Sequence, residues 1–277
     1  MIPKIIHYCW FGGSPMPELA QKCIASWKKY CPDYEIKRWD ESNFDFEICD
    51  YVKEAYRAKK WAFVSDFARF WILYNYGGIY FDTDVEVLQS IDPIVLKGPF
   101  WGRERRNNSF QVLVNTGLGM ASEKKDRIYK EIIDHYKTLH FVNEDGTYNK
   151  KTVVEYVSNL LYRKGLPEKS EKDNIIYMVE GITIYPWEFF CPMAYETGEI
   201  TLTKNTYTIH HFTASWKSKE EMEMKKTYDK LVGFLGKNKG KYVFQIVIIP
   251  LKIKGKIKEI GFRKTFKLII KRGKRND

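Results

Sequence analysis

Residues 61–84 read WAFVSDFARFWILYNYGGIYFDTD, and this stretch decides the expected fold. Between positions 61 and 74 the only charged residues are Asp66 and Arg69, so the run predicts a helix that is apolar almost all round and therefore buried. Glycine tolerates the left-handed backbone that ends helices, so the Gly-Gly pair at 77–78 predicts the helix end. The Ile-Tyr-Phe run at 79–81 then predicts a short buried strand.

Charged side chains inside this buried segment point to a site. Asp66 and Arg69 are three residues apart on one helix face, so they can pair with each other or present a carboxylate and a guanidinium to one ligand. The strand brings Asp82 and Asp84 to its carboxyl end, where ligands bind in open α/β sheets. Residues two apart in extended chain point the same way, so both carboxylates can face one divalent cation, or one can act through water or a sugar hydroxyl. Alone, each pair would be an ordinary ion pair or a solvated turn; their combination is far more specific.

The motifs Ser65-Asp66, Arg69, Gly77-Gly78-Ile79-Tyr80 and Asp82-Thr83-Asp84 resemble the sugar-binding segment of glycosyltransferase family 32. This family includes yeast initiating mannosyltransferases and bacterial capsule glycosyltransferases, and the string is also similar to the glucosyltransferase domains of large clostridial toxins. The resemblance covers about residues 2–217, with gaps between motifs. It implies an α/β fold of the GT-A type, with a Rossmann-like nucleotide-sugar-binding domain and a mixed central sheet. It also implies a nucleotide-sugar donor, a divalent metal, usually manganese, and retention of anomeric configuration.

Two further segments supply candidate donor contacts. Residues 2–13, IPKIIHYCWFGG, read as a first strand running into a glycine turn. Strand one of a nucleotide-binding α/β fold ends where the nucleotide lies, so Trp10 could stack on a base; the alternative is a core residue. Residues 111–120 read as a strand ending in a turn, and the resemblance places an Asn or Asp there against the donor sugar. Asn115 is therefore a candidate, with an Asx turn as its ordinary role.

The segment at 207–217, YTIHHFTASWK, supplies the last candidates. A strand points His210 and His211 to opposite faces, so at most one joins the aspartates at a metal. The resemblance to a closing His-x-x-x-Ser-Trp motif implies a histidine ligand, and we expect His211, with His210 as the alternative. It also implies that Ser215, Trp216 and Lys217 lie near the donor diphosphate. Imidazole beside carboxylates suits manganese better than calcium, and magnesium is the second candidate metal.

Composition bounds the class of protein. At 277 residues the chain can form one large α/β domain, or one domain with appendages. The five cysteines are odd in number and form no Cys-x-x-Cys pair, which favours a reducing compartment and argues against zinc. The first apolar run, at 4–7, is too short and polar for a signal peptide, so we expect a cytoplasmic protein.

The net charge of +11 is concentrated at the C-terminus. Residues 237–277 contain 14 Lys and Arg against Glu259 and Asp277, which leaves residues 1–236 at −1. We therefore expect a GT-A domain over 1–236 and a basic amphipathic tail over 237–277. Isoleucine and phenylalanine interleaved with lysine favour contact with an anionic membrane, here the inner face of the cell membrane, at about 1 kcal/mol per basic residue. A nucleic-acid-binding tail is the alternative, and the interleaved apolar residues argue against it.

The expected function is a metal-dependent retaining hexosyltransferase. It would move a hexose from a nucleotide diphosphate sugar, UDP-hexose, to a glycan or lipid-linked saccharide in capsule, exopolysaccharide or other surface-glycan synthesis. The expected catalytic residues are Asp66, Arg69 and Asp84, with Asp82, Asp84 and His211 at the metal. A glycoside hydrolase needs two separated carboxylates flanking a sugar, which the Asp-x-Asp spacing does not suggest. A non-catalytic, membrane-associated glycan-binding or scaffold protein is the other alternative.

Overall fold

The structure is a computed structural model, and it describes residues 1–105, 111–195, 197–213, 219–236, 239, 242–244, 247–261 and 265. The chain divides into two compact units. The first consists of residues 1–141 and 150–213, and the second contains 142–149 and the described residues from 219 onward. The division falls after Thr213, whereas the boundary expected from sequence is at 236.

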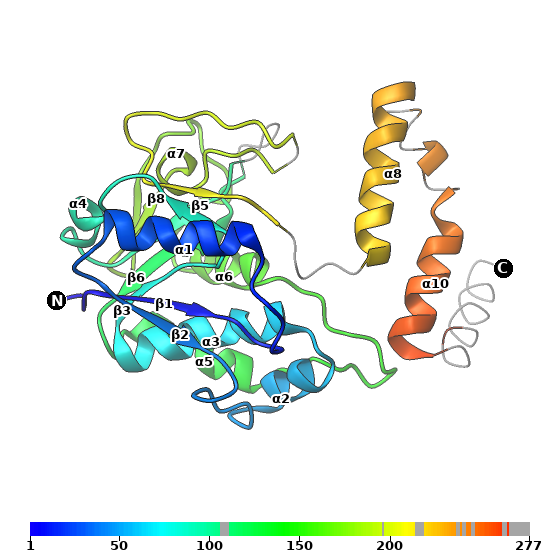
Figure 1. The fold of residues 1–277 in the computed structure, drawn as a ribbon, viewed down its shortest axis with the longest axis horizontal. Helices are drawn as coiled ribbons and strands as arrows, with labels where there is room; N and C mark the ends of the chain where they lie inside the picture. Colours follow the sequence, from blue (N-terminus) through cyan, green and yellow to red (C-terminus); the bar gives the residue numbers. More distant parts are fainter. Residues whose placement is uncertain are drawn as a thin grey trace. The chain divides into compact units, whose positions relative to one another are not determined.

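The first unit is built on a mixed seven-stranded sheet in the order β2-β1-β3-β6-β5-β8-β7 (Figure 1). The pairs β1–β2, β1–β3 and β5–β8 are parallel, and β3–β6, β5–β6 and β7–β8 are antiparallel. The prediction of an α/β domain with a mixed central sheet is confirmed. The strands are β1 (Ile5–Cys9), β2 (Glu35–Trp39), β3 (Gly78–Tyr80), β5 (Phe100–Arg103), β6 (Val114–Ser122), β7 (Tyr177–Val179) and β8 (Ile182–Tyr185).

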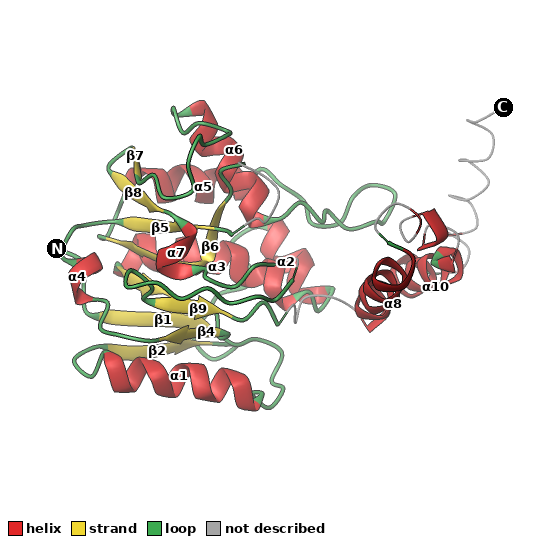
Figure 2. Cartoon of the chain, turned by 90° about the horizontal axis from the view of Figure 1, so that it is seen from above, coloured by secondary structure: helices red, strands yellow, loops and turns green. Residues whose placement is uncertain are grey.

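A small second sheet pairs β4 (Val85–Val87) with β9 (Thr208–His210) in antiparallel register. Helices of the first unit are α1 (Glu18–Tyr30), α2 (Asp50–Arg57), α3 (Trp61–Tyr76), α4 (Asp92–Val95), α5 (Arg127–Lys137), α6 (Val153–Arg163) and α7 (Trp187–Phe190). Figure 1 shows α1 above β1 and α3 below it, and Figure 2 shows the strands one above another, from β2 beside α1 to β7.

Strand alternation explains this layering. On β1, Tyr8 meets Trp27 of α1 at a ring distance of 5.6 Å, whereas the neighbouring His7 faces the α3 side. After Tyr80 of β3, which lies under Arg69 of α3, the next residue Phe81 contacts Trp27 again. Successive side chains thus pack alternately on the α1 side and on the α3 side of the sheet, as the two-residue period of an extended chain requires.

The predicted central helix is confirmed as α3, which is buried along most of its length. It ends at Gly77, whose φ of 65° lies in the left-handed region, and the Gly77 N–H donates to the Leu73 carbonyl at 2.8 Å. A Cβ at Gly77 would also lie 2.9 Å from the Pro3 ring. The chain enters β3 directly after this turn, so α3 fixes where the strand begins.

His7 ties three elements together beneath this turn. Its Nε2 lies 3.0 Å from the Gly77 carbonyl oxygen, and the Trp39 indole N–H donates to its Nδ1 at 3.1 Å. The ring is completely buried, and that burial lowers the pKa of His7 from 6.5 to about 4. The neutral ring is therefore the form that the native state requires.

In the second unit, α8 (Lys219–Leu235) and α10 (Ile249–Ile260) pack against each other. Tyr228 of α8 also meets Phe244 edge-on at a ring distance of 5.0 Å. Among the helices that the structure describes, none combines the length and the apolar character needed to cross a bilayer.

The buried neutral His7 predicts acid sensitivity of the fold. The unfolded chain takes up a proton near pH 6.5 and the native state only near pH 4, so stability is present above pH 6.5 and is lost as the pH falls toward 4. The loss attributable to His7 is about 3 kcal/mol over this interval. We expect denaturant titrations at pH 7 and 4.5 to show a smaller pH difference for His7→Gln than for the parent. The exposed His140→Gln is the control, and an unchanged pH difference in His7→Gln would contradict this assignment.

Candidate active site around the Asp82-Thr83-Asp84 turn

The acidic motif lies directly after β3, in a tight turn and not in extended chain. The Val85 N–H donates to the Asp82 carbonyl at 3.0 Å, which closes the turn, and the Asp82 N–H donates to the Gly117 carbonyl at 3.1 Å. The two carboxylates therefore converge because the backbone turns. We expected the two carboxylates to point the same way because residues two apart do so in extended chain. That reason is wrong, although the carboxylates of Asp82 and Asp84 do lie close together.

Asp84 is held by the strand that returns as β9. One carboxylate oxygen accepts hydrogen bonds from the Thr213 N–H at 2.9 Å and the Thr213 hydroxyl at 2.8 Å. The other oxygen lies 3.0 Å from His210 Nε2. Burial alone would raise the pKa of Asp84, but His210 and Thr213 outweigh it and hold this pKa well below its ordinary value. Asp84 is therefore ionised at neutral pH.

The two adjacent histidines face opposite ways, and the structure places His210 beside the aspartates. The β4–β9 register pairs His210 with Val85, next to Asp84. The Nε2 of His211 lies instead 2.9 Å from a carboxylate oxygen of Glu86. The expectation that His211 faces Asp82 and Asp84 is therefore wrong. Strand alternation predicts that the two histidines point to opposite faces, and the pairing of β9 with β4 determines that His210 is the one beside Asp82 and Asp84.

The residues fit a divalent cation. Asp82, Asp84 and His210 each offer one ligand atom, and these atoms lie within 4.8 Å of one another. Nε2 of His210 lies 3.0 Å from Asp84 and is the ring nitrogen that faces the motif, whereas Nδ1 is buried without a hydrogen-bond partner in the described part of the chain. Two carboxylates and an imidazole form a donor set that suits Mn²⁺.

Arg69 joins the helix to this motif. Its Nη2 lies 2.9 Å from Asp66 and 3.1 Å from Asp82, so one guanidinium bridges two carboxylates. Its Nε–H also donates to the Ser65 carbonyl at 3.1 Å, and its Cζ lies 5.0 Å from the centre of the Tyr80 ring. The predicted pairing of Asp66 with Arg69 is thus found, and Asp82 is included in it.

The three charged side chains differ in exposure. Arg69 is 3% exposed, Asp66 14% and Asp82 27%, so Asp82 is the most accessible to a ligand. Burial raises the pKa of Asp66 to about 7, with the Arg69 charge opposing this effect and the Asp82 charge adding to it. The ion pair between Asp66 and Arg69 fixes both side chains before any ligand binds, so their hydrogen-bonding groups are already in position for a ligand.

Asn115 lies on β6, two residues before Gly117, which is next to Asp82. Its amide donates to the buried Glu104 carboxylate at 2.9 Å, and its Oδ1 accepts from the Gly117 N–H at 2.8 Å. A Cβ at Gly117 would lie 2.0 Å from an Asp82 carboxylate oxygen, so only glycine leaves Asp82 its place. Glu104 and Gly117 could not be found from the sequence, because the pairing of β6 with β3 brings Gly117 to Asp82 and the pairing of β5 with β6 brings Glu104 to Asn115.

The remaining candidates are unequally placed. Trp10 follows the carboxyl end of β1 and is partly buried, with its indole N–H donating to the Ser14 carbonyl at 2.7 Å. Nearby, the Trp61 indole covers Gly12, where a Cβ would lie 2.4 Å from Trp61 Nε1. Base stacking by Trp10 stays a prediction. Ser215, Trp216 and Lys217 lie outside the described residues.

The chain resembles several known glycosyltransferases. It is 37% identical over 110 residues to inositol phosphoceramide mannosyltransferase 3 of Schizosaccharomyces pombe, an alignment that covers 37% of this chain and 29% of the relative. It is 25% identical over 207 residues to an uncharacterized glycosyltransferase of Acanthamoeba polyphaga mimivirus, covering 69% and 78%. The chain thus spans less than a third of the yeast relative's length.

Two solved structures show similarity at low identity. One is a glycosyltransferase involved in glycosylation of the major capsid of PBCV-1, at a TM-score of 0.43 and 17% identity, covering 76% of this chain and 95% of that one. The other is the PaToxG glycosyltransferase, at a TM-score of 0.39 and 20% identity, covering 59% and 70%.

The histidine assignment predicts a difference between two neighbouring variants. We expect His210→Gln to weaken Mn²⁺ binding at least about tenfold, since it removes one ligand of three, and His211→Gln to leave it within about twofold. Electron paramagnetic resonance of free Mn²⁺ during a titration measures both. Loss of binding in His211→Gln alone would reverse the assignment.

The contact at Gly117 predicts that one methyl group disturbs the motif. We expect Gly117→Ala to displace Asp82 and weaken Mn²⁺ binding at least about tenfold, while the far-ultraviolet circular dichroism spectrum stays unchanged. Gly233→Ala is the matched control, because a Cβ there meets no atom within 4 Å. Parent-like Mn²⁺ affinity in Gly117→Ala would show that Asp82 is not needed in its present position.

The position of the motif agrees with a family-level match. Residues 17–101 match the family described as glycosyltransferase sugar-binding region containing DXD motif, and this range includes α1, α3, β3 and the Asp82-Thr83-Asp84 turn. This match and the mixed sheet agree with the class expected from sequence, a nucleotide-sugar-binding α/β domain of the GT-A type. Residues 17–101 are therefore similar to the sugar-binding region of DXD-containing glycosyltransferases, and the Asp82-Thr83-Asp84 turn lies inside the matched range.

Proposed function

We propose that this protein is a metal-dependent glycosyltransferase that moves a hexose from a UDP-sugar to a saccharide acceptor. The observation that carries the proposal is the convergence of Asp82, Asp84 and His210 on one location after β3. A divalent cation held there, Mn²⁺ or Mg²⁺, would neutralise the charge that develops on the leaving diphosphate.

The protein's own side chains position the donor. Asp66 would accept hydrogen bonds from sugar hydroxyls, and Arg69 would hold Asp66 and Asp82 in register while facing donor phosphate or sugar. Asn115 would contact the sugar from the β6 side, with its amide oriented by Glu104. Trp10 would stack on the base, and the Ser215–Lys217 segment would contact the diphosphate.

We propose retention of configuration, for which the family resemblance is the support. The carboxylates around the site are already engaged, Asp66 and Asp82 by Arg69 and Glu104 by Asn115, which does not favour a free enzyme nucleophile. We therefore propose front-face transfer. The bond from the sugar C1 to the diphosphate oxygen breaks, the acceptor oxygen bonds to C1 on the same face, and its proton passes to the departing diphosphate.

The names of the relatives do not agree on one class of acceptor. The yeast relative is named for inositol phosphoceramide and one solved structure for a viral capsid protein, so acceptors within this group differ. We propose a glycan or lipid-linked saccharide in capsule, exopolysaccharide or other surface-glycan synthesis. The rival reading is a non-catalytic glycan-binding or scaffold protein, which would bind sugars without turning over any donor.

A donor panel tests the proposal. We expect one of UDP-glucose, UDP-galactose, UDP-N-acetylglucosamine and GDP-mannose to release nucleotide in the presence of Mn²⁺ and not in the presence of a chelator. Asp84→Asn should lower this release at least about a hundredfold, because charge stabilisation at the leaving group is lost. The exposed Asp134→Asn should leave release unchanged.

Outcomes separate the alternatives. Release from GDP-mannose alone would retain the transferase and replace the UDP donor. Release that is equal with and without metal would reject the metal assignment. Neither release nor nucleotide binding across the panel would reject the transferase in favour of the scaffold reading.

A further inference from the structure

Exposed apolar side chains gather in the second unit. Twelve large hydrophobic side chains are exposed among the residues that the structure describes, and five of them lie between positions 234 and 253. These five are Phe234, Tyr242, Val247, Ile249 and Ile253. Large apolar side chains concentrated on a small unit indicate a surface that meets another apolar phase.

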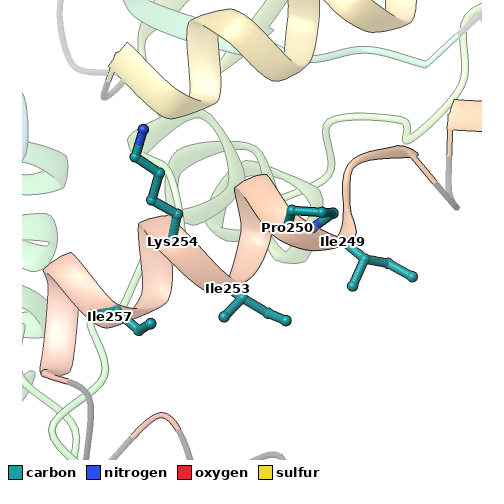
Figure 3. A pocket seen from close by; sticks show the side chains of 5 residues that line it. All are labelled: Ile249, Pro250, Ile253, Lys254 and Ile257. Carbon is teal, nitrogen blue, oxygen red and sulfur yellow. The ribbon is translucent and has the colours of Figure 1, made fainter.

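Helix α10 organises part of this surface. Ile249, Ile253 and Ile257 are spaced four residues apart and therefore follow one helix face, and with Pro250 they line a hollow on the helix surface (Figure 3). In Figure 3 the side chains of Ile249 and Ile253 extend from one side of α10 and that of Lys254 from another. Ile249 is 51% and Ile253 38% exposed.

The positive charge around the isoleucine face of α10 indicates what kind of partner binds there. Lys252 and Lys254 are both exposed and lie on either side of the isoleucine face, as their positions in the helix require. The sequence from 237 to 277 carries a charge of +12. Isoleucine flanked by lysine allows the apolar side chains to enter acyl chains while the ammonium groups stay at the headgroups. A nucleic acid would pair with the lysines and leave the isoleucines in water.

We propose that the α10 face formed by Ile249, Pro250, Ile253 and Ile257, with Lys252 and Lys254 at its edges, binds the surface of an anionic lipid bilayer. The helix lies in the plane of the interface, because its length and lysine content exclude a spanning position. This proposal stands apart from the proposed transferase activity, since it concerns the second unit and is measured without a donor.

Vesicle cosedimentation of the full chain tests the proposal. We expect binding to vesicles of phosphatidylcholine with 30% phosphatidylglycerol, and at least about tenfold weaker binding to phosphatidylcholine alone. Binding should weaken as NaCl rises from 0.1 to 0.5 M, because salt screens the lysine charges.

A pair of matched double variants separates this face from general hydrophobicity. Ile249→Ser with Ile253→Ser should weaken binding to the anionic vesicles at least about tenfold. Ile200→Ser with Leu202→Ser removes two comparably exposed apolar side chains from the first unit and should leave binding unchanged. Equal binding by both double variants would overturn the proposal.

Other occupants give distinct results. Tighter binding to a single-stranded RNA than to anionic vesicles, lost on adding salt but unaffected by the α10 serines, would replace the bilayer by nucleic acid. A dimer in lipid-free sedimentation that Ile249→Ser with Ile253→Ser converts to monomer would show that a second copy covers the face. Either result would contradict the proposal.

Discussion

The buried guanidinium of Arg69 is the interaction on which the site depends. It lies within 3.1 Å of Asp66 on its own helix and of Asp82 after β3, and it is almost fully buried. Two carboxylates this close would repel each other in a low-dielectric surrounding, and a single cation between them offsets part of that repulsion. The position of the Asp-Thr-Asp turn is thereby coupled to α3, and the tight contact of Gly117 with Asp82 fixes it from the other side.

The local part of this arrangement could be predicted from the sequence. An apolar run with two charges, a Gly-Gly pair and a short apolar strand each have a direct local cause, so α3, its end at Gly77 and the following β3 were expected with nearly their observed limits. The pairing of Asp66 with Arg69 was one of the two roles expected from their spacing on one helix face. These features depend on residues within one turn of helix or one strand of each other, whereas the mixed α/β sheet was expected only from the family resemblance.

The contacts between distant segments could not be predicted in this way. Alternation places His210 and His211 on opposite faces, but only the register of β9 against β4 brings His210 to Asp84. Glu104 reaches Asn115 because β5 pairs with β6 across a bulge between Trp101 and Gly102. Arg103 is only 3% exposed, because the pairing of β5 buries it beside Tyr177. Each of these outcomes is set by strand pairing.

We propose that the acidic turn and His210 form one cation site for a sugar donor. The most direct measurement is an anomalous difference map from crystals grown with Mn²⁺ and UDP. We expect one strong manganese peak bounded by Asp82, Asp84 and His210, with the diphosphate on its open side. A peak between Glu86 and His211, or bound UDP with no manganese near Asp84, would contradict it.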